Sequence, residues 1–177
     1  MKQELRLSGS GGQGLILAGI ILAEAALLDG KLAIQSQSYG PEARGGSSKS
    51  EVMISDEEIY FPKVTKPNLV LVMSQEAAKK YVDDLSDAGV LVTDSLFVKD
   101  LPTSFKGKVY ELPITHTAKT ELGKALFANI IALGSIVKLT GLVTEASIIK
   151  AVLNRVPKGT EEVNEKAIKL GMWRYQH

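Results

Sequence analysis

The residues with the clearest chemical potential are the glycines near the start of this 177-residue chain, which suit anion binding. Gly9, Gly11 and Gly14 have G-x-G-x-x-G spacing, between a strand-like segment and a long apolar one, where this spacing has meaning. Glycine lets the backbone approach a ligand, and a following helix N-terminus favours phosphate or carboxylate. The alternative is a turn that only joins strand to helix. The candidate binding residues are Gly9, Ser10, Gly11, Gly12, Gln13 and Gly14.

A second candidate segment covers residues 38–49, where glycine, serine and one proline predict a loop. Arg44 offers a planar fork of donors for a phosphate or carboxylate. Tyr39 precedes it, and Gly45 and Gly46 follow it directly. Because loops at strand ends often carry function, we expect these four residues to contribute to the anion site. A solvated surface loop is the alternative.

The chain lacks the residues of a complete active site. It has no cysteine, and its two histidines are His116 and His177. These facts exclude disulfides, a cysteine nucleophile and a cysteine-ligated iron–sulfur cluster in this chain, and they argue against a zinc site. Neither a Ser-His-Asp order nor a carboxylate cluster with metal-ligand spacing is present. We therefore predict a binding subunit of a larger assembly, with no catalytic residue and no metal ligand.

Composition and charge point to a cytoplasmic protein. The net charge of +1 gives no support to nucleic-acid binding. The longest apolar segment, Leu15 to Leu28, is too short to span a bilayer comfortably, and no signal peptide is visible. We expect no membrane partner and no nucleic-acid partner.

The pattern of elements predicts an α/β fold, a three-layer sandwich around a mostly parallel sheet. Residues 3–37 form its first, Rossmann-like β-α-β unit, and residues 68–73 and 89–93 are typical of buried parallel strands. Residues 50–55 predict an antiparallel strand at the sheet edge. We see no linker and expect a single domain over residues 1–177.

The remaining helices are predicted from caps and glycines. They cover residues 75–85, 121–139, 145–154 and 161–171. Ser74, Thr144 and Thr160 are the predicted N-caps, and the threonine-rich residues 114–120 are expected to form a loop. Gly134 in the long helix indicates close backbone packing.

The two glycine segments together resemble the γ subunit of 2-oxoacid:ferredoxin oxidoreductases. The first signature is Ser8-Gly-Ser-Gly-Gly-Gln-Gly14, and the second is Ser38-Tyr-Gly-Pro-Glu-Ala-Arg-Gly-Gly46. Asn129 with Ala132-Leu-Gly134, followed by Leu139-Thr-Gly-Leu-Val143, is similar to the C-terminal segment of that family. The resemblance covers nearly the whole chain in the same order.

The resemblance implies an enzyme complex that converts a 2-oxoacid, coenzyme A and oxidised ferredoxin to acyl-CoA, CO2 and reduced ferredoxin. It implies that thiamine diphosphate, magnesium and iron–sulfur clusters belong to the α and β subunits or a ferredoxin-like δ subunit. The γ subunit would contribute to the coenzyme A site and to assembly. The loop from Tyr39 to Gly46 is closer to the 2-oxoglutarate type than to the pyruvate type, while branched-chain 2-oxoacids and indolepyruvate stay open.

Two alternatives compete with this interpretation. One is a freestanding nucleotide-binding reductase, which would use NAD or flavin. The acidic residue that holds the NAD ribose is missing where the second strand ends, at Gln35 to Ser38, and this counts against NAD. The other is a purely structural subunit whose glycine turn packs against a partner.

Overall fold

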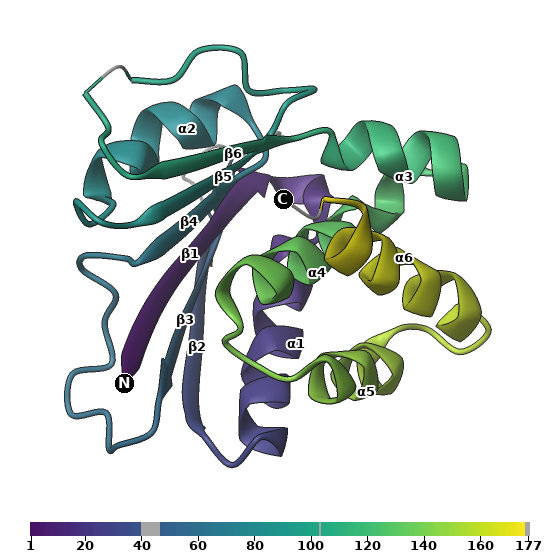
Figure 1. The fold of residues 1–177 in the computed structure, drawn as a ribbon, viewed down its shortest axis with the longest axis horizontal. Helices are drawn as coiled ribbons and strands as arrows, with labels where there is room; N and C mark the ends of the chain where they lie inside the picture. Colours follow the sequence, from purple (N-terminus) through teal and green to yellow (C-terminus); the bar gives the residue numbers. More distant parts are fainter. Residues whose placement is uncertain (40–46, 103, 176–177) are drawn as a thin grey trace.

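The computed structural model describes residues 1–39, 47–102 and 104–175, and it contains one six-stranded sheet. The strand order is β2-β3-β1-β4-β5-β6 (Figure 1). β1, β4, β5 and β6 pair in parallel, while β3 is antiparallel to both β1 and β2. The strands are β1 Lys2–Ser10, β2 Leu32–Tyr39, β3 Ser47–Ser55, β4 Leu69–Val72, β5 Val90–Asp94 and β6 Lys108–Leu112. The predicted α/β class and mostly parallel sheet are confirmed.

Helices form an unequal layer on each face of the sheet (Figure 1). α2 (Gln75–Tyr81) covers one face, and the other five α-helices pack on the opposite face. These five are α1 Leu15–Leu28, α3 Ile114–Leu122, α4 Ala128–Thr140, α5 Glu145–Arg155 and α6 Glu161–Arg174. Short 3-10 turns complete the list: η1 Gly11–Gln13, η2 Val82–Asp84 and η3 Ala125–Phe127. The arrangement has the three layers expected from the sequence.

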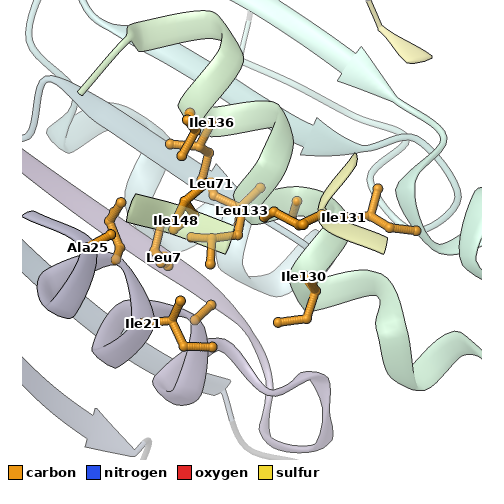
Figure 2. Close-up of a cluster of buried hydrophobic side chains, with 14 of the residues drawn as sticks. Leu7, Ile21, Ala25, Leu71, Ile130, Ile131, Leu133, Ile136 and Ile148 are labelled. Atoms are coloured by element: carbon orange, nitrogen blue, oxygen red, sulfur yellow. The ribbon is translucent and has the colours of Figure 1, made fainter. Parts of the chain in front are cut away.

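The larger core lies between the sheet and the five-helix layer. Leu7 and Leu71 from the sheet meet Ile21 of α1, Leu133 of α4 and Ile148 of α5 (Figure 2). α1 therefore buries more than one of its faces, as its apolar sequence predicts. This packing fixes the start of α1, and with it the glycine turn.

The position of β3 differs from the prediction. It is antiparallel as expected, but it lies inside the sheet, between β1 and β2, and β2 takes the edge. The reason is that the serine-containing first half of β3 is largely buried, like its apolar second half. Ser50 is fully buried against α1, where a Cβ on Gly19 would lie 2.0 Å from the Ser50 hydroxyl oxygen. Glycine and serine thus allow the helix to pack closely over this strand.

Residues 114–139 also differ from the prediction, which placed a loop before a single helix. The threonine-rich segment is helix α3, and Gly123, at φ +79°, ends it before α4 begins. Asp94, at the end of β5, accepts hydrogen bonds from the backbone N–H and the hydroxyl of Thr115. A buried carboxylate that caps the first turn from another strand is invisible in the local sequence.

Caps and close contacts account for the other helices. Ser74 and Thr144 accept hydrogen bonds from Ala77 and Ser147, as predicted for N-caps. Thr160 has the predicted N-cap position before Glu161, but its hydroxyl donates to the Pro157 carbonyl oxygen and caps no helical N–H.

Close packing at Gly134 is confirmed by its contact with α6. A Cβ at Gly134 would lie 2.3 Å from the Ile168 carbonyl oxygen. α4 and α6 therefore cross with backbone against backbone at this glycine.

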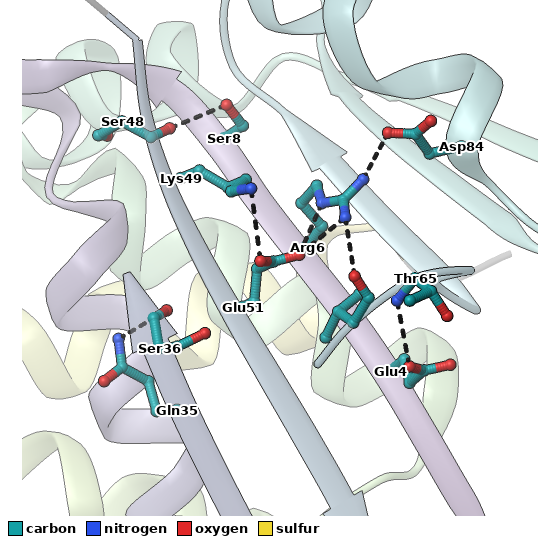
Figure 3. Close-up of polar contacts among 11 residues, drawn as sticks. Glu4, Arg6, Ser8, Gln35, Ser36, Ser48, Lys49, Glu51, Thr65 and Asp84 are labelled. Atoms are coloured by element: carbon teal, nitrogen blue, oxygen red, sulfur yellow. Dashed lines mark hydrogen bonds and ion pairs between the residues drawn. The ribbon is translucent and has the colours of Figure 1, made fainter. Parts of the chain in front are cut away.

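A polar cluster occupies the α2 face beside the smaller core (Figure 3). Arg6 of β1 is only 6% exposed. Its guanidinium group forms ion pairs with Glu51 at 2.8 Å and Asp84 at 2.6 Å, and it lies 5.3 Å from the centroid of the Tyr81 ring. Lys49 lies 3.4 Å from the second carboxylate oxygen of Glu51. Each buried charge is thus compensated, and the cluster joins β1, β3 and the end of α2.

Candidate functional site

The glycine turn lies at the carboxyl end of β1, the edge where ligands bind in open α/β sheets. The chain leaves β1 toward α1 on one face, whereas it leaves the adjacent β4 toward α2 on the other. The two strands therefore form a switch point in the topology, the usual location of a binding crevice.

The sheet register also brings the two predicted motifs together. Ser10 is paired with Ser47, so one end of the second segment adjoins the glycine turn. Tyr39, at the other end, is paired with Ser48 and is separated from the turn by β3, and it does not line the hollow described below. The Tyr39 side chain is 70% exposed. Arg44, Gly45 and Gly46 lie outside the described residues, and their contribution to the site stays a prediction.

Gln13 holds the turn in shape. Its side-chain oxygen accepts a hydrogen bond from the backbone N–H of Ser10, and its amide nitrogen donates to the Met73 carbonyl oxygen, both at 2.8 Å. The side chain thus joins the ends of β1 and β4. A Cβ at Gly9 would lie 2.1 Å from this same Gln13 oxygen, so Gly9 makes room for the link.

Gly14 is required by the backbone and by its neighbour. It has φ +72°, a left-handed conformation that favours glycine. A Cβ there would lie 2.6 Å from the amide nitrogen of Asn129, which donates to the Gly14 carbonyl oxygen at 3.1 Å. Gly9, Gln13 and Gly14 therefore have structural roles that the sequence alone does not separate from ligand binding.

Gly11 and Gly12 are both exposed at the tip of the turn. A Cβ at Gly12 would have no atom within 4 Å, and neither backbone conformation nor packing demands glycine there. The open space in front of Gly12 is the part of the turn that a ligand can reach.

A hollow of about 300 Å³ opens beside this tip. The glycine turn forms one wall, and the other walls come from the loop after β5, from α3, from η3 and from the first residue of α4. The lining residues are Ser10, Gly12, Gln13, Phe97, Thr115, Lys119, Ala125, Leu126 and Ala128. Its volume is at the lower end for a small-molecule site, and its wall is mostly apolar with one cation, the exposed Lys119.

Six lining residues were not predicted from the sequence: Phe97, Thr115, Lys119, Ala125, Leu126 and Ala128. The signal for Lys119 and Thr115 was hidden because the segment was expected to be a loop. As part of α3, Lys119 follows Thr115 by one helical turn, so both face the hollow. Phe97 and Leu126 are large, exposed apolar side chains, which a sequence cannot distinguish from core residues.

The polar residues at this strand edge are already engaged. Ser74 caps α2, and the Asp94 carboxylate accepts from the N–H groups of Leu96 and Thr115, both at 3.1 Å. These residues organise the loops around the hollow. Among the described residues that line the hollow, Lys119 is the charged one.

Within the described ranges, no group of three or more His, Asp or Glu side chains has the arrangement of a metal site. No helix among the described residues is long and apolar enough to cross a membrane. His116, exposed on α3, is not a lining residue of the hollow.

The fold and the hollow define an α/β protein with an open glycine-rich turn at a topological switch point. The chain belongs to the pyruvate ferredoxin/flavodoxin oxidoreductase family, whose model matches residues 4–173. The resemblance found in the two glycine segments is therefore confirmed.

Relatives narrow the assignment within the family. The chain is 51% identical to the 2-oxoglutarate synthase subunit KorC of Methanocaldococcus jannaschii, over 97% of this chain and 92% of that protein. It is 50% identical to a keto/oxoacid ferredoxin oxidoreductase γ subunit from Geobacter sulfurreducens, with a TM-score of 0.86 and 96% of each chain covered.

A second solved structure shares the fold alone. It is the 2-oxoglutarate:ferredoxin oxidoreductase of Magnetococcus marinus, with 2-oxoglutarate, coenzyme A and succinyl-CoA bound. The identity is 22%, the TM-score is 0.85, and the match covers 96% of this chain but 30% of that one.

Proposed function

We propose that this chain is the γ subunit of a 2-oxoglutarate:ferredoxin oxidoreductase and forms part of its coenzyme A site. The complex would convert 2-oxoglutarate, coenzyme A and oxidised ferredoxin to succinyl-CoA, CO2 and reduced ferredoxin. The relatives support this subunit role and this substrate. Thiamine diphosphate, magnesium and the iron–sulfur clusters would be held by α, β or δ subunits, which fits a chain without cysteine.

The observation that carries the coenzyme A proposal is the open tip of the glycine turn beside Lys119 in one hollow. The turn offers backbone N–H groups and the start of α1 to a phosphate, and the ammonium group adds an opposite charge. Phe97 and Leu126 supply an apolar wall suited to the nonpolar faces of the adenine ring. Arg44, in the second glycine segment, stays a predicted contributor to the same site.

The candidate residues of the turn divide into those with a structural contact and those that face open space, and the two groups would have different functions. Gly9, Gln13 and Gly14 would shape the turn, while Ser10, Gly11 and Gly12 would meet the ligand. The chain would act as a single cytoplasmic domain whose site is completed by its partners. A freestanding reductase is no longer favoured, because the relatives are subunits.

The test replaces Gly12 by Asp and, as a matched neutral control, by Asn in the purified complex. The two side chains have nearly the same size, and space exists for either Cβ. We expect the KM for coenzyme A to rise at least tenfold more in Gly12→Asp than in Gly12→Asn, with 2-oxoglutarate KM and subunit masses unchanged. Equal coenzyme A KM values in both variants, with assembly intact, would leave the turn a purely structural element.

A second pair tests the hollow itself. Lys119→Gln removes the charge, and Lys119→Arg keeps it on the same exposed side of α3. We expect Lys119→Gln to weaken coenzyme A binding several-fold, while Lys119→Arg retains most of it. An unchanged coenzyme A affinity in both variants would mean that the phosphates do not bind in this hollow.

A further inference from the structure

Helix α3 is the wall of the hollow that carries its charged residue, and contacts from outside the helix hold it in place. It has nine residues, and Thr115 and Lys119 on one side of it line the hollow. Pro113, at its N-cap position, makes no side-chain cap hydrogen bond. A helix this short is not stable in isolation. The groups that hold α3 therefore decide where Lys119 lies.

Asp94, at the end of β5, holds the start of α3 together with a second wall of the hollow. It is fully buried. Its Oδ2 atom accepts from the backbone N–H and the hydroxyl of Thr115, at the start of α3. Its Oδ1 atom accepts from the backbone N–H of Leu96 at 3.1 Å, in the loop that carries Phe97. One carboxylate thus fixes the two walls that contain Phe97 and Lys119.

The end of α6 holds α3 from another side (Figure 1). The hydroxyl oxygen of Tyr175 lies 2.8 Å from that of Thr117. The Thr117 hydroxyl donates to the Pro113 carbonyl oxygen at 2.8 Å, which leaves it able to accept from Tyr175. Arg174 forms an ion pair with Glu121 at 2.8 Å. Because residues two apart do not share a side of a helix, these contacts lie away from the side of α3 that lines the hollow.

We propose that Asp94 and Tyr175 are positioning residues for coenzyme A, which act by holding α3 so that Lys119 faces the hollow. The inference rests on the proposed function, in which the phosphates of coenzyme A lie near Lys119. Neither Asp94 nor Tyr175 lines the hollow, so neither acts by touching the ligand.

The two oxygens of Asp94 make its replacement by asparagine informative. Both oxygens accept from N–H groups, whereas an asparagine has one oxygen and would turn its NH2 group toward the other donor. Asp94→Asn therefore keeps the size of the side chain and releases one of the two walls.

The test is a double-mutant cycle in the purified complex, with the KM for coenzyme A as the measurement. Asp94→Asn should raise this KM several-fold, and by a smaller factor when Lys119→Gln is already present, because Asp94 acts partly through Lys119. The KM for 2-oxoglutarate should stay unchanged. Thr144→Ala removes a hydrogen bond of the α5 N-cap, away from the hollow, and as a control should leave the coenzyme A KM unchanged.

Tyr175→Phe keeps the proposal testable if Asp94→Asn does not fold, because it removes one hydroxyl from a partly buried side chain. It should raise the KM for coenzyme A by about twofold, since only one hydrogen bond is lost. This effect should disappear in the Lys119→Gln background. Tyr60→Phe, at a position that is 87% exposed, is the matched control. Far-UV circular dichroism and subunit masses check folding and assembly.

Three results would overturn the proposal. The first is an unchanged coenzyme A KM in folded Asp94→Asn or Tyr175→Phe complexes while Lys119→Gln raises it, in which case the proposed function stands and this inference alone fails. The second is a rise by the same factor with and without Lys119→Gln, which would mean that the two residues act on the fold as a whole. The third is an unchanged KM in Lys119→Gln itself, which would count against the proposed function and this inference together.

Discussion

The amide nitrogen of Asn129 donates a hydrogen bond to the carbonyl oxygen of Gly14 at 3.1 Å, across 115 residues of sequence. This bond ties the start of α4 to the glycine turn. Asn129 is 6% exposed, and its own side-chain oxygen accepts from the backbone N–H of Ile130. The geometry of the glycine turn therefore depends on a residue that is far from either glycine segment in the sequence.

The first prediction compares two glycines of the same turn. Gly14→Ala should reduce the free energy of unfolding by about 2 kcal/mol or more, because a left-handed alanine costs about 1–2 kcal/mol and the new Cβ displaces Asn129. Gly12→Ala should change it by less than about 0.5 kcal/mol, since nothing lies near that Cβ. Urea unfolding measures both values. Equal losses would contradict the division of the turn into structural and open positions.

Much of this fold could be predicted because its signals are local. The strand–turn–helix context of the glycine motif, the apolar strands β4 and β5, and the caps at Ser74 and Thr144 each depend on a few neighbouring residues. The strand order could not be predicted in the same way. β3 lies inside the sheet because Ser50 allows α1 to pack closely on it at Gly19, which is a contact between distant segments.

The candidate site also has one part with a local sequence signal and one part that depends on contacts between distant segments. The glycine wall was visible in the sequence, whereas the wall containing Lys119 was not. Lys119 reaches the hollow because α3 forms, and α3 begins where Asp94 from β5 caps Thr115. A cap supplied by another strand leaves no signal in the segment that it stabilises. The sequence therefore revealed the motif but not the opposite side of the hollow.

The second prediction concerns the crossing of α4 and α6. A Cβ at Gly171 would lie 2.0 Å from the Ile131 carbonyl oxygen, and backbone atoms cannot move aside as a flexible side chain can. Gly171→Ala should lower the free energy of unfolding by about 2 kcal/mol, although alanine favours a helix by about 1 kcal/mol. Lys166→Ala, at an exposed position of α6, is the control and should stay within about 0.5 kcal/mol. A stabilised Gly171→Ala variant would show that the helices do not cross so closely.

The third prediction addresses the buried charges of Figure 3. Arg6→Met should cost about 3 kcal/mol, because it leaves the mostly buried Glu51 carboxylate with only the longer Lys49 contact. The double variant Arg6→Met, Glu51→Gln should lose less than the sum of the two single variants, since removing both charges avoids an uncompensated one. Denaturant unfolding of the unmodified chain, the two single variants and the double variant gives the four free energies of this double-mutant cycle. Additive losses would mean that the pair is not coupled.

The fourth prediction is a pH dependence that arises at Asp29, the residue that follows α1. Partial burial acts to raise the pKa of Asp29, but the hydrogen bonds from Ser147 and Thr144 and the charge of Lys31 outweigh it and leave the pKa below its ordinary value. The carboxylate accepts from the Thr144 backbone N–H at 2.7 Å and its hydroxyl at 2.8 Å, at the start of α5.

Because the folded-state pKa of Asp29 is lowered, its stabilising effect is complete above the unfolded-state value and disappears as the pH falls through the folded-state value. The unmodified chain should therefore be more stable than Asp29→Asn at pH 7, and the difference should shrink steadily below about pH 4. Urea unfolding at pH 7, 5, 4 and 3 measures this difference. Glu57→Gln, at an exposed position in the turn after β3, serves as the matched control and should show no such convergence. A gap between the unmodified chain and Asp29→Asn that persists at pH 3 would mean that packing, not the carboxylate charge, joins α1 to α5.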